Sequence, residues 1–218
     1  VGHGQGPEVG AVLSRAGRGA AATTATTLIE RFGVDRILFT GVAGGLAEGA
    51  RVGDVVGARS FLQHDMDGSP LFPRFEVPLY GKARFATDTA LSDALAAAAG
   101  AVLADAETAL GADAVAEFNL RAPRLHQGLI VSGDRFIATS ADGATLRGAM
   151  PDALAVEMEG AAVAQVCDDY GLPFAALRTL SDRADDDASV DFMRFIERVA
   201  SRYSAAILDR HFRLLPKT

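Results

Sequence analysis

The 218-residue sequence predicts an α/β fold in which helices cover a parallel or mixed central sheet. Three observations support this: short apolar runs typical of strands alternate with helical segments, glycine-rich turns separate them, and 49% of the residues are hydrophobic. A chain of this length fits one large domain better than two small ones. The same composition, with only 22% charged residues, excludes a disordered or collagen-like protein.

Hydrophobic patterning places the individual elements along the chain. The predicted strands are Val9–Ser14, Arg36–Thr40, Val52–Ala58, His126–Ser132, Ala153–Val156 and Phe174–Leu180. The predicted helices are Ala20–Phe32, Ser92–Leu110, Thr145–Met150, Gly160–Tyr170 and Phe192–Phe212. Helical spacing in the last of these predicts a buried face formed by Phe195, Val199, Tyr203 and Ile207.

The segment Gln63–Gly81 differs from the rest of the chain. It contains three prolines and several aromatic residues, so we expect a long irregular loop. Long ordered loops in compact domains often form lids or interfaces, and this one is therefore a candidate dimer contact.

The net charge and the cysteine content bear on binding partners and on the cellular compartment. The net charge of −7 and the pI near 5.1 argue against nucleic acid and against an anionic membrane surface, because both favour basic patches. The single cysteine, Cys167, excludes a disulfide within the chain and favours a reducing, cytoplasmic location. The acidic residues Asp168 and Asp169 follow it and oppose thiolate formation, so we expect an unreactive thiol.

Polar clusters follow three predicted strands, after Val131, Val156 and Leu180. In open α/β sheets, ligands bind beyond the carboxyl ends of the strands. These clusters are therefore the first candidates for a functional site.

The cluster after Val156 contains Glu157, Met158 and Glu159. Carboxylates this close to a core strand are costly unless they are solvated or hydrogen-bonded. A carboxylate can accept both hydroxyls of a ribose diol, and methionine offers a pliable apolar wall to a sugar or base. The alternative is a helix N-terminus at which glutamates complement the macrodipole.

Two further clusters contain residues that could take part in catalysis or ligand binding. Arg178 interrupts an apolar strand that ends in Ser181 and Asp182, and an aspartate in a partly buried site can act as a general acid. The alternative is that Ser181 or Asp182 caps a turn. Phe136, after the strand ending at Ser132, could stack on a planar base or could equally be a core residue beside a surface turn.

Glycine-rich segments at Ser14–Arg18 and Thr40–Gly45 are expected to be turns after strands, where backbone N–H groups could hold an anion or a sugar oxygen. Simple tight turns are the alternative, and the spacing does not match a dinucleotide-binding motif. His64, Asp65 and Asp67 resemble part of a metal site, but they lack a second histidine or cysteine nearby, so we expect no metal.

In combination, the motifs resemble a known family. Ser132-Gly-Asp-Arg-Phe-Ile, Val156-Glu-Met-Glu and Arg178-x-x-Ser-Asp, in this order, are similar to the nucleoside phosphorylase/hydrolase superfamily, and most similar to its 5′-methylthioadenosine/S-adenosylhomocysteine nucleosidases. The resemblance implies a three-layer α/β/α sandwich with a mixed central sheet and a homodimer. It also implies a cytoplasmic enzyme of methionine salvage that hydrolyses the N-glycosidic bond of an adenine nucleoside without a metal or cofactor. The products would be adenine and the 5-substituted ribose.

The resemblance assigns roles at the base. Asp182 would protonate N7 of the leaving adenine, and Ser181 would orient its carboxyl group. Phe136 would stack on the base, Ile137 would offer backbone groups to its edge, and Phe192 would close over the pocket.

At the sugar, the resemblance implies that Glu159 holds the ribose hydroxyls while Met158 packs against the ring. Glu157 and Arg178 would complete the polar wall, with Arg178 among the catalytic residues. The 63–81 loop would help to cover the 5′ substituent, in its own or in the partner subunit. The remaining expected substrate contacts are Val42, Ala43 and Gly44.

Two departures from the family pattern stand out. The family begins with a strand and a glycine-rich turn whose glutamate activates the attacking water, and this segment has no counterpart in the sequence. We therefore interpret residues 1–218 as a single domain that lacks its first strand. Val42 replaces a hydroxyl-bearing residue that many relatives carry, which favours water over phosphate as the nucleophile.

Other functions remain open at this stage. A purine nucleoside phosphorylase would use Arg15 or Arg18 as anion ligands. A hydrolase of a futalosine-type nucleoside is a second possibility, and a nucleoside-binding protein without catalytic activity is a third.

Overall fold

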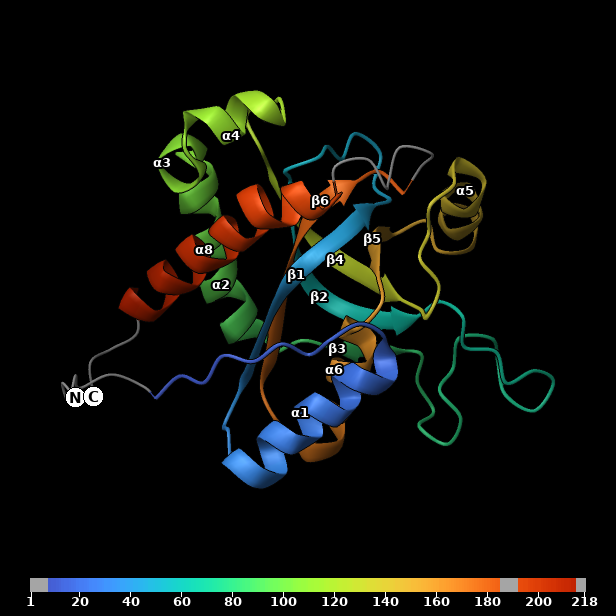
Figure 1. Ribbon diagram of the computed structural model, residues 1–218. Helices are drawn as coiled ribbons and strands as arrows, with labels where there is room; N and C mark the ends of the chain where they lie inside the picture. The colour runs from blue at the N-terminus through green and yellow to red at the C-terminus, as the bar shows by residue number, and fades with distance from the viewer. Residues whose placement is uncertain (1–7, 185–191, 215–218) are drawn as a thin grey trace.

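The computed structural model describes residues 8–184 and 192–214 (Figure 1). The strands are β1 Ile37–Gly45, β2 Val55–Gln63, β3 Arg84–Ala86, β4 Leu125–Ser132, β5 Ala153–Glu157 and β6 Phe174–Asp182. The helices are α1 Arg18–Phe32, α2 Thr89–Leu103, α3 Ala106–Leu110, α4 Ala112–Glu117, α5 Ser140–Ala149, α6 Gly160–Tyr170, α7 Phe192–Phe195 and α8 Ser201–Leu214. A π-helical turn, Ile196–Ala200, joins α7 to α8.

The six strands form one mixed sheet in the order β3-β2-β4-β5-β1-β6. Neighbours β2 and β4, β4 and β5, and β1 and β6 are parallel, whereas β1 and β5 are antiparallel. A further antiparallel pairing between β2 and β6 closes the sheet on itself. This closure brings β6 between β1 and β2.

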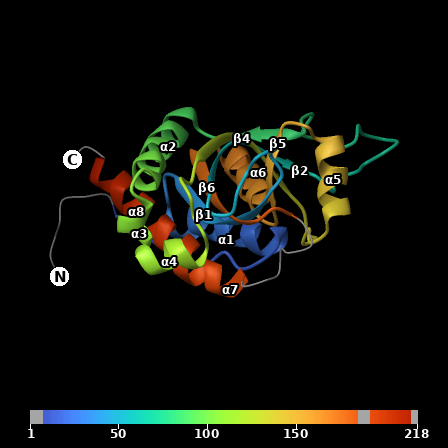
Figure 2. The ribbon, with the colours of Figure 1, turned by 90° about the horizontal axis from the view of Figure 1, so that it is seen from above.

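Helices cover the sheet from two sides, which confirms the predicted α/β fold class (Figure 2). Helices α1 and α6 pack together on one side, and α2 and α8 pack together on the other. Apolar side chains fill both interlayer spaces, and the predicted buried face of the closing helix is confirmed. No helix within the described ranges has the length and hydrophobicity needed to cross a membrane.

Two expectations about strands were wrong. Val9–Ser14 belongs to no strand of the described structure, and residues 9–13 are exposed, with Leu13 89% exposed. The Gly41–Gly45 segment is not a turn, because β1 continues through Gly45. Glycine serves there to admit neighbouring side chains rather than to bend the chain: a Cβ on Gly41 would collide with the Arg178 guanidinium.

The helical expectations needed smaller corrections. The helix expected over Ser92–Leu110 is divided, because the Asp105 side chain accepts a hydrogen bond from the Thr108 N–H at 3.3 Å and begins α3 as a new helix. Helix α5 begins before Thr145, since Thr139 caps its N-terminus. Strand β3 and helix α4 were not predicted.

The strand registers bring the polar clusters together. Gly44 of β1 is paired with Asp182 of β6 and with Val156 of β5. Ser132 of β4 is paired with Glu157. Residues that are far apart in sequence thus meet at one end of the sheet.

Candidate active site

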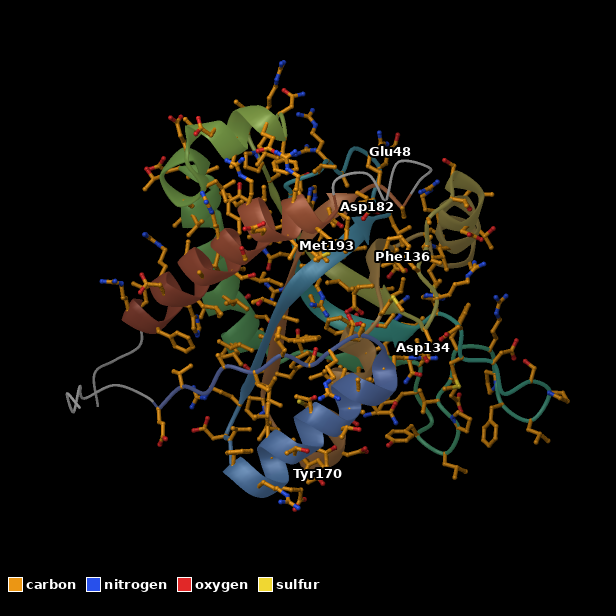
Figure 3. All side chains as sticks on the ribbon, viewed as in Figure 1. Glu48, Asp134, Phe136, Tyr170, Asp182 and Met193 are labelled. Atoms are coloured by element: carbon orange, nitrogen blue, oxygen red, sulfur yellow. The ribbon has the colours of Figure 1, made fainter. Side chains whose placement is uncertain are left out.

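The site lies at the ends of β1, β4, β5 and β6, where Figure 3 shows Asp182 and Phe136 on the same side of the sheet. Tyr170, by contrast, lies at the opposite end of the molecule. The predicted convergence of polar residues beyond the strand ends is therefore present in the fold.

Asp182 is 7% exposed and is held at both carboxylate oxygens. The Ala184 N–H donates to Oδ1 at 2.8 Å, and the Ser181 hydroxyl donates to Oδ2 at 2.7 Å. The Ser181 Oγ also lies 3.5 Å from the carbonyl oxygen of Ala43. This hydroxyl can donate to an ionised Asp182, or accept from a protonated one while donating to Ala43, so both protonation states of the carboxyl group find a partner.

Glu157 is buried and fully hydrogen-bonded. It accepts the backbone N–H groups of Glu159 at 3.1 Å and of Gly160 at 2.9 Å, together with the Ser132 hydroxyl and the Arg178 guanidinium. The glutamate expected at a helix N-terminus is thus a helix-capping residue and an ion-pair partner at the same time. This arrangement fixes the turn between β5 and α6.

Glu159 is half-buried and less completely neutralised. Its Oε1 accepts the Gly17 backbone N–H at 2.7 Å, and its Oε2 lies 3.9 Å from Arg178 Nη2. Burial raises the pKa of the Glu159 carboxyl group, the Gly17 hydrogen bond opposes this, and the nearby Glu157 adds to it. Two carboxylates share one guanidinium here, so the local charge is negative.

Arg178 is 2% exposed and is sandwiched between β1 and the two glutamates. Its guanidinium carbon lies 4.1 Å from the centroid of the Phe39 ring, a cation–π contact. Its Nε is buried without a hydrogen-bond partner in the described structure. The charge of Arg178 is therefore directed to Glu157 and Glu159.

Apolar side chains lie on the segments next to these polar groups. Phe136 is 47% exposed, and its ring meets the half-buried Phe192 edge to face, at 6.1 Å between centroids. Met158 is half-buried, whereas Ile137 is 4% exposed and packs in a core cluster with Ala184. An exposed aromatic face beside a buried carboxyl group suits a planar heterocycle.

Comparisons with known proteins identify the family. The family model for the phosphorylase superfamily matches residues 1–213. The chain belongs to the phosphorylase superfamily. A 5′-methylthioadenosine/S-adenosylhomocysteine nucleosidase from Neisseria meningitidis, in complex with methylthio-immucillin-A, is 36% identical, with a TM-score of 0.77 over 93% of this chain and 80% of that chain.

Two further solved structures are similar to this chain. Futalosine hydrolase of Helicobacter pylori is 33% identical, with a TM-score of 0.74 over 93% of this chain and 78% of that chain. The S-adenosylhomocysteine nucleosidase of Streptococcus pyogenes, in complex with 5-methylthiotubericidin, is 30% identical, with a TM-score of 0.75 over 93% and 78% of the two chains. The predicted resemblance to nucleosidases of the phosphorylase superfamily is confirmed.

Ser132 and Gly17 lie in candidate segments of the sequence, but their contacts with the two glutamates were not predicted. Ser132 donates its hydroxyl to Glu157 and accepts the Ala161 N–H at 2.8 Å, thereby joining β4 to α6. Gly17, with φ +88°, donates its backbone N–H to Glu159. The glycine preceding α1 was a visible signal for Gly17, but its partner lies 142 positions away.

Arg15 and Arg18, the anion ligands expected of a phosphorylase, do not form a cluster of unpaired cations. Arg18 is engaged by Asp65 and Asp134, at 2.8 and 3.0 Å, and holds the pKa of Asp134 below its usual range. Arg15 is exposed.

No group of three or more His, Cys, Asp or Glu side chains in the described ranges could hold a metal ion. The Asp185–Asp187 run lies outside the described residues.

Proposed function

We propose that the chain hydrolyses the N-glycosidic bond of an adenine nucleoside of the 5′-methylthioadenosine or S-adenosylhomocysteine type, releasing adenine and the 5-substituted ribose. The observation that carries this proposal is the placement of Ser181 and Asp182 on β6 and of Glu157 and Glu159 at the end of β5, with the glycine-rich end of β1 between them. In this arrangement a general acid, Asp182, would face a sugar site lined by carboxylates. Solved relatives at 30–36% identity, named as nucleosidases, support the same reaction class.

In this proposal Asp182 protonates N7 of the adenine as the bond to the sugar breaks. A neutral adenine is a better leaving group than its anion, which is the contribution expected of a general acid. Ser181 aims the carboxyl group in both of its protonation states, as the 2.7 Å contact allows. The Ala184 N–H holds the second oxygen of Asp182 in place.

The sugar side stabilises positive charge. Bond cleavage builds oxocarbenium character on the ribose, and negative groups nearby lower the energy of that state. Glu159 would bind the 2′- and 3′-hydroxyls, with Met158 against the ring. Glu157 and Arg178 hold the turn that carries Glu159, and Arg178 extends the polar wall towards the reacting carbon.

The base would lie between apolar groups. Phe136 would stack on adenine, the backbone of Ile137 would meet its edge, and Phe192 would close over it, as the contact between the two phenylalanine rings allows. The β1 residues Val42, Ala43 and Gly44 would line the floor, where β1 lies beside Asp182.

Water is the nucleophile that the charges favour. A phosphorylase needs cationic groups available for phosphate. Arg178 and Arg18 are each engaged by two carboxylates, and Val42 supplies no hydroxyl. The local charge therefore repels an anionic nucleophile.

Two alternatives to hydrolysis of a methylthioadenosine-type nucleoside remain to be tested. The 33% identity to futalosine hydrolase keeps a futalosine-type nucleoside as a second candidate substrate. A nucleoside-binding protein without turnover is a third candidate, which release of adenine would exclude.

We further propose that residues 1–218 act as one nucleosidase domain within a homodimer, with the 63–81 loop at the subunit contact. Exposed apolar side chains on this loop support the assignment: Leu71 is 84% and Leu79 91% exposed. A cytoplasmic role in methionine salvage would fit the proposed substrates and the buried thiol of Cys167.

The test is to incubate the purified protein with methylthioadenosine, with and without phosphate, and to identify the products. Adenine and free methylthioribose, independent of phosphate, are expected. A sugar 1-phosphate formed only with phosphate would indicate a phosphorylase. Tight binding without adenine release would indicate a binding protein, and turnover of futalosine alone would change the substrate.

A further inference from the structure

Arg18, the first residue of α1, joins the end of β2 and the turn after β4 through one guanidinium group. Its Nε and Nη2 donate to Asp134 Oδ2 at 3.1 and 3.0 Å. Its Nη1 donates to Gln63 Oε1 at 2.7 Å, and its Nη2 donates to Asp65 Oδ2 at 2.9 Å. The Arg18 backbone N–H also donates to Asp134 Oδ1 at 3.0 Å.

The partners of Arg18 are themselves connected. The Asp134 N–H donates to Asp65 Oδ2 at 3.1 Å, and Gln63 Nε2 donates to Gln165 Oε1 of α6 at 2.7 Å. The guanidinium therefore ties the end of β2 and the turn after β4 to the start of α1, and the Gln63 amide extends this network to helix α6. A lysine could not do this, because a single ammonium group lacks the planar fork that reaches several acceptors in fixed directions.

The ion pair between Arg18 and Asp134 adds little to the stability of the fold. Asp134 is an exposed partner, with its side chain 55% accessible, and ion pairs of that kind contribute little to folding. Two carboxylates around one guanidinium also leave a net negative charge. The network fixes geometry more than it adds stability.

What the network fixes is the spacing between two proposed substrate contacts. Asp134 stands two residues before Phe136, the proposed stacking residue. Gly17, adjacent to Arg18, donates its N–H to Glu159, the proposed ribose ligand, at 2.7 Å. The start of α1 thus holds the base side and the ribose side of the pocket through consecutive residues.

We propose that Arg18 is a positioning residue that holds the Asp134–Phe136 turn at a set distance from Glu159, so that the base and the ribose are bound together. This inference rests on the proposed nucleosidase function. Arg18 itself need not touch the substrate. Its removal should weaken the joint binding of base and sugar while leaving the Ser181–Asp182 acid intact.

The test compares Arg18→Gln and Arg18→Lys with a matched control, Arg84→Gln. Arg84 makes a similar two-point ion pair with Asp152, at 2.6 and 3.1 Å, and belongs to no part of the proposed site. For each protein we would measure kcat and KM for methylthioadenosine, the inhibition constant of free adenine, and the melting temperature.

We expect both Arg18 variants to raise KM about tenfold, the effect of losing roughly 1.4 kcal/mol of binding. We expect kcat and the inhibition constant of adenine to change by less than about threefold, because neither the acid nor stacking of the base alone depends on the tether. Arg84→Gln should leave KM unchanged. An Arg18→Gln, Asp134→Asn double variant should be no worse than Arg18→Gln alone, since both changes remove one interaction.

The outcomes separate the two proposals. An unchanged KM in Arg18→Gln, an equal rise in Arg84→Gln, or full rescue by lysine would overturn the positioning role while wild-type turnover upholds the proposed function. A purely structural role would lower the melting temperature without moving KM. Absence of turnover in the wild-type protein would overturn the proposed function and this inference with it.

Discussion

Gly44 lies against the carboxylate of Asp182, its partner across β1 and β6. A Cβ on Gly44 would come within 2.8 Å of Asp182 Oδ1 and 3.1 Å of the Ala184 Cβ. The close approach explains why a glycine occupies the interior of a strand, where it weakens the backbone. It also places the backbone of β1 directly beside the proposed acid.

Replacing Asp182 with asparagine should abolish the acid without disturbing the fold. Asparagine keeps an oxygen for the Ala184 N–H but has no proton to deliver to N7. We expect kcat to fall by about 10²–10⁴-fold, the range for loss of general acid catalysis. Adenine release and thermal unfolding would be measured together, with Asp152→Asn as the control. Full activity in Asp182→Asn would contradict the acid assignment.

Gly44→Ala should impair activity more than stability. The added methyl group would push on the Asp182 carboxylate and displace it from the base. We expect kcat/KM to fall at least about tenfold, since small displacements of a catalytic group are costly. Gly148→Ala in α5, where a Cβ meets nothing within 4 Å, is the matched control and should retain full activity. Equal activity of the two variants would show that Gly44 does not set the position of the acid.

Glu159→Gln should stabilise the protein while lowering its activity. Burial raises the pKa of Glu159, so the folded state favours the protonated form, and ionisation costs stability as pH rises from the usual value of 4.5 through the raised pKa. The variant should therefore melt higher than wild type at pH 7, and the difference should vanish below pH 4.5. Loss of a charged hydrogen-bond acceptor should lower kcat/KM about 10- to 100-fold.

Thermal unfolding of wild type and Glu159→Gln between pH 4 and pH 8 checks this sign. A melting temperature below that of wild type at pH 7 would mean that the Gly17 hydrogen bond outweighs the cost of burying the charge. Glu48→Gln, which removes one carboxylate at an exposed position, is the matched control.

Gly17→Ala tests the conformation that delivers the backbone N–H to Glu159. Gly17 has φ +88°, and its Cβ would meet only Asp134 Oδ1, at 3.6 Å, so the cost is backbone strain rather than a clash. We expect a loss of about 1–2 kcal/mol in unfolding free energy together with a higher KM. Gly19→Ala, within α1 and with nothing within 4 Å of its Cβ, should instead stabilise by about 0.5–1 kcal/mol. The unfolding free energies of the two variants, measured with denaturant, test whether backbone strain at Gly17 is the cause. Equal unfolding free energies would refute the strain argument.

Local sequence patterns were sufficient to predict much of the secondary structure and several candidate site residues. Apolar periodicity predicted the buried face of Phe195, Val199, Tyr203 and Ile207, and short adjacent motifs indicated Glu157 with Glu159 and Ser181 with Asp182. These features lie within a few residues of one another, so side-chain chemistry along the chain is enough to reveal them. The same signals misread Gly41–Gly45, because glycine marks a turn and a close approach within a strand equally well.

The tertiary structure alone decided which distant groups meet. The pairing of Gly44 with Asp182, the hydrogen bond from Gly17 to Glu159 and the engagement of Arg18 by Asp65 and Asp134 all join separate elements. Strand register and helix packing depend on how whole faces bury against one another, which no local window of sequence contains. The candidate site residues could therefore be proposed from motifs in the sequence, whereas the charge balance and contacts around them could not.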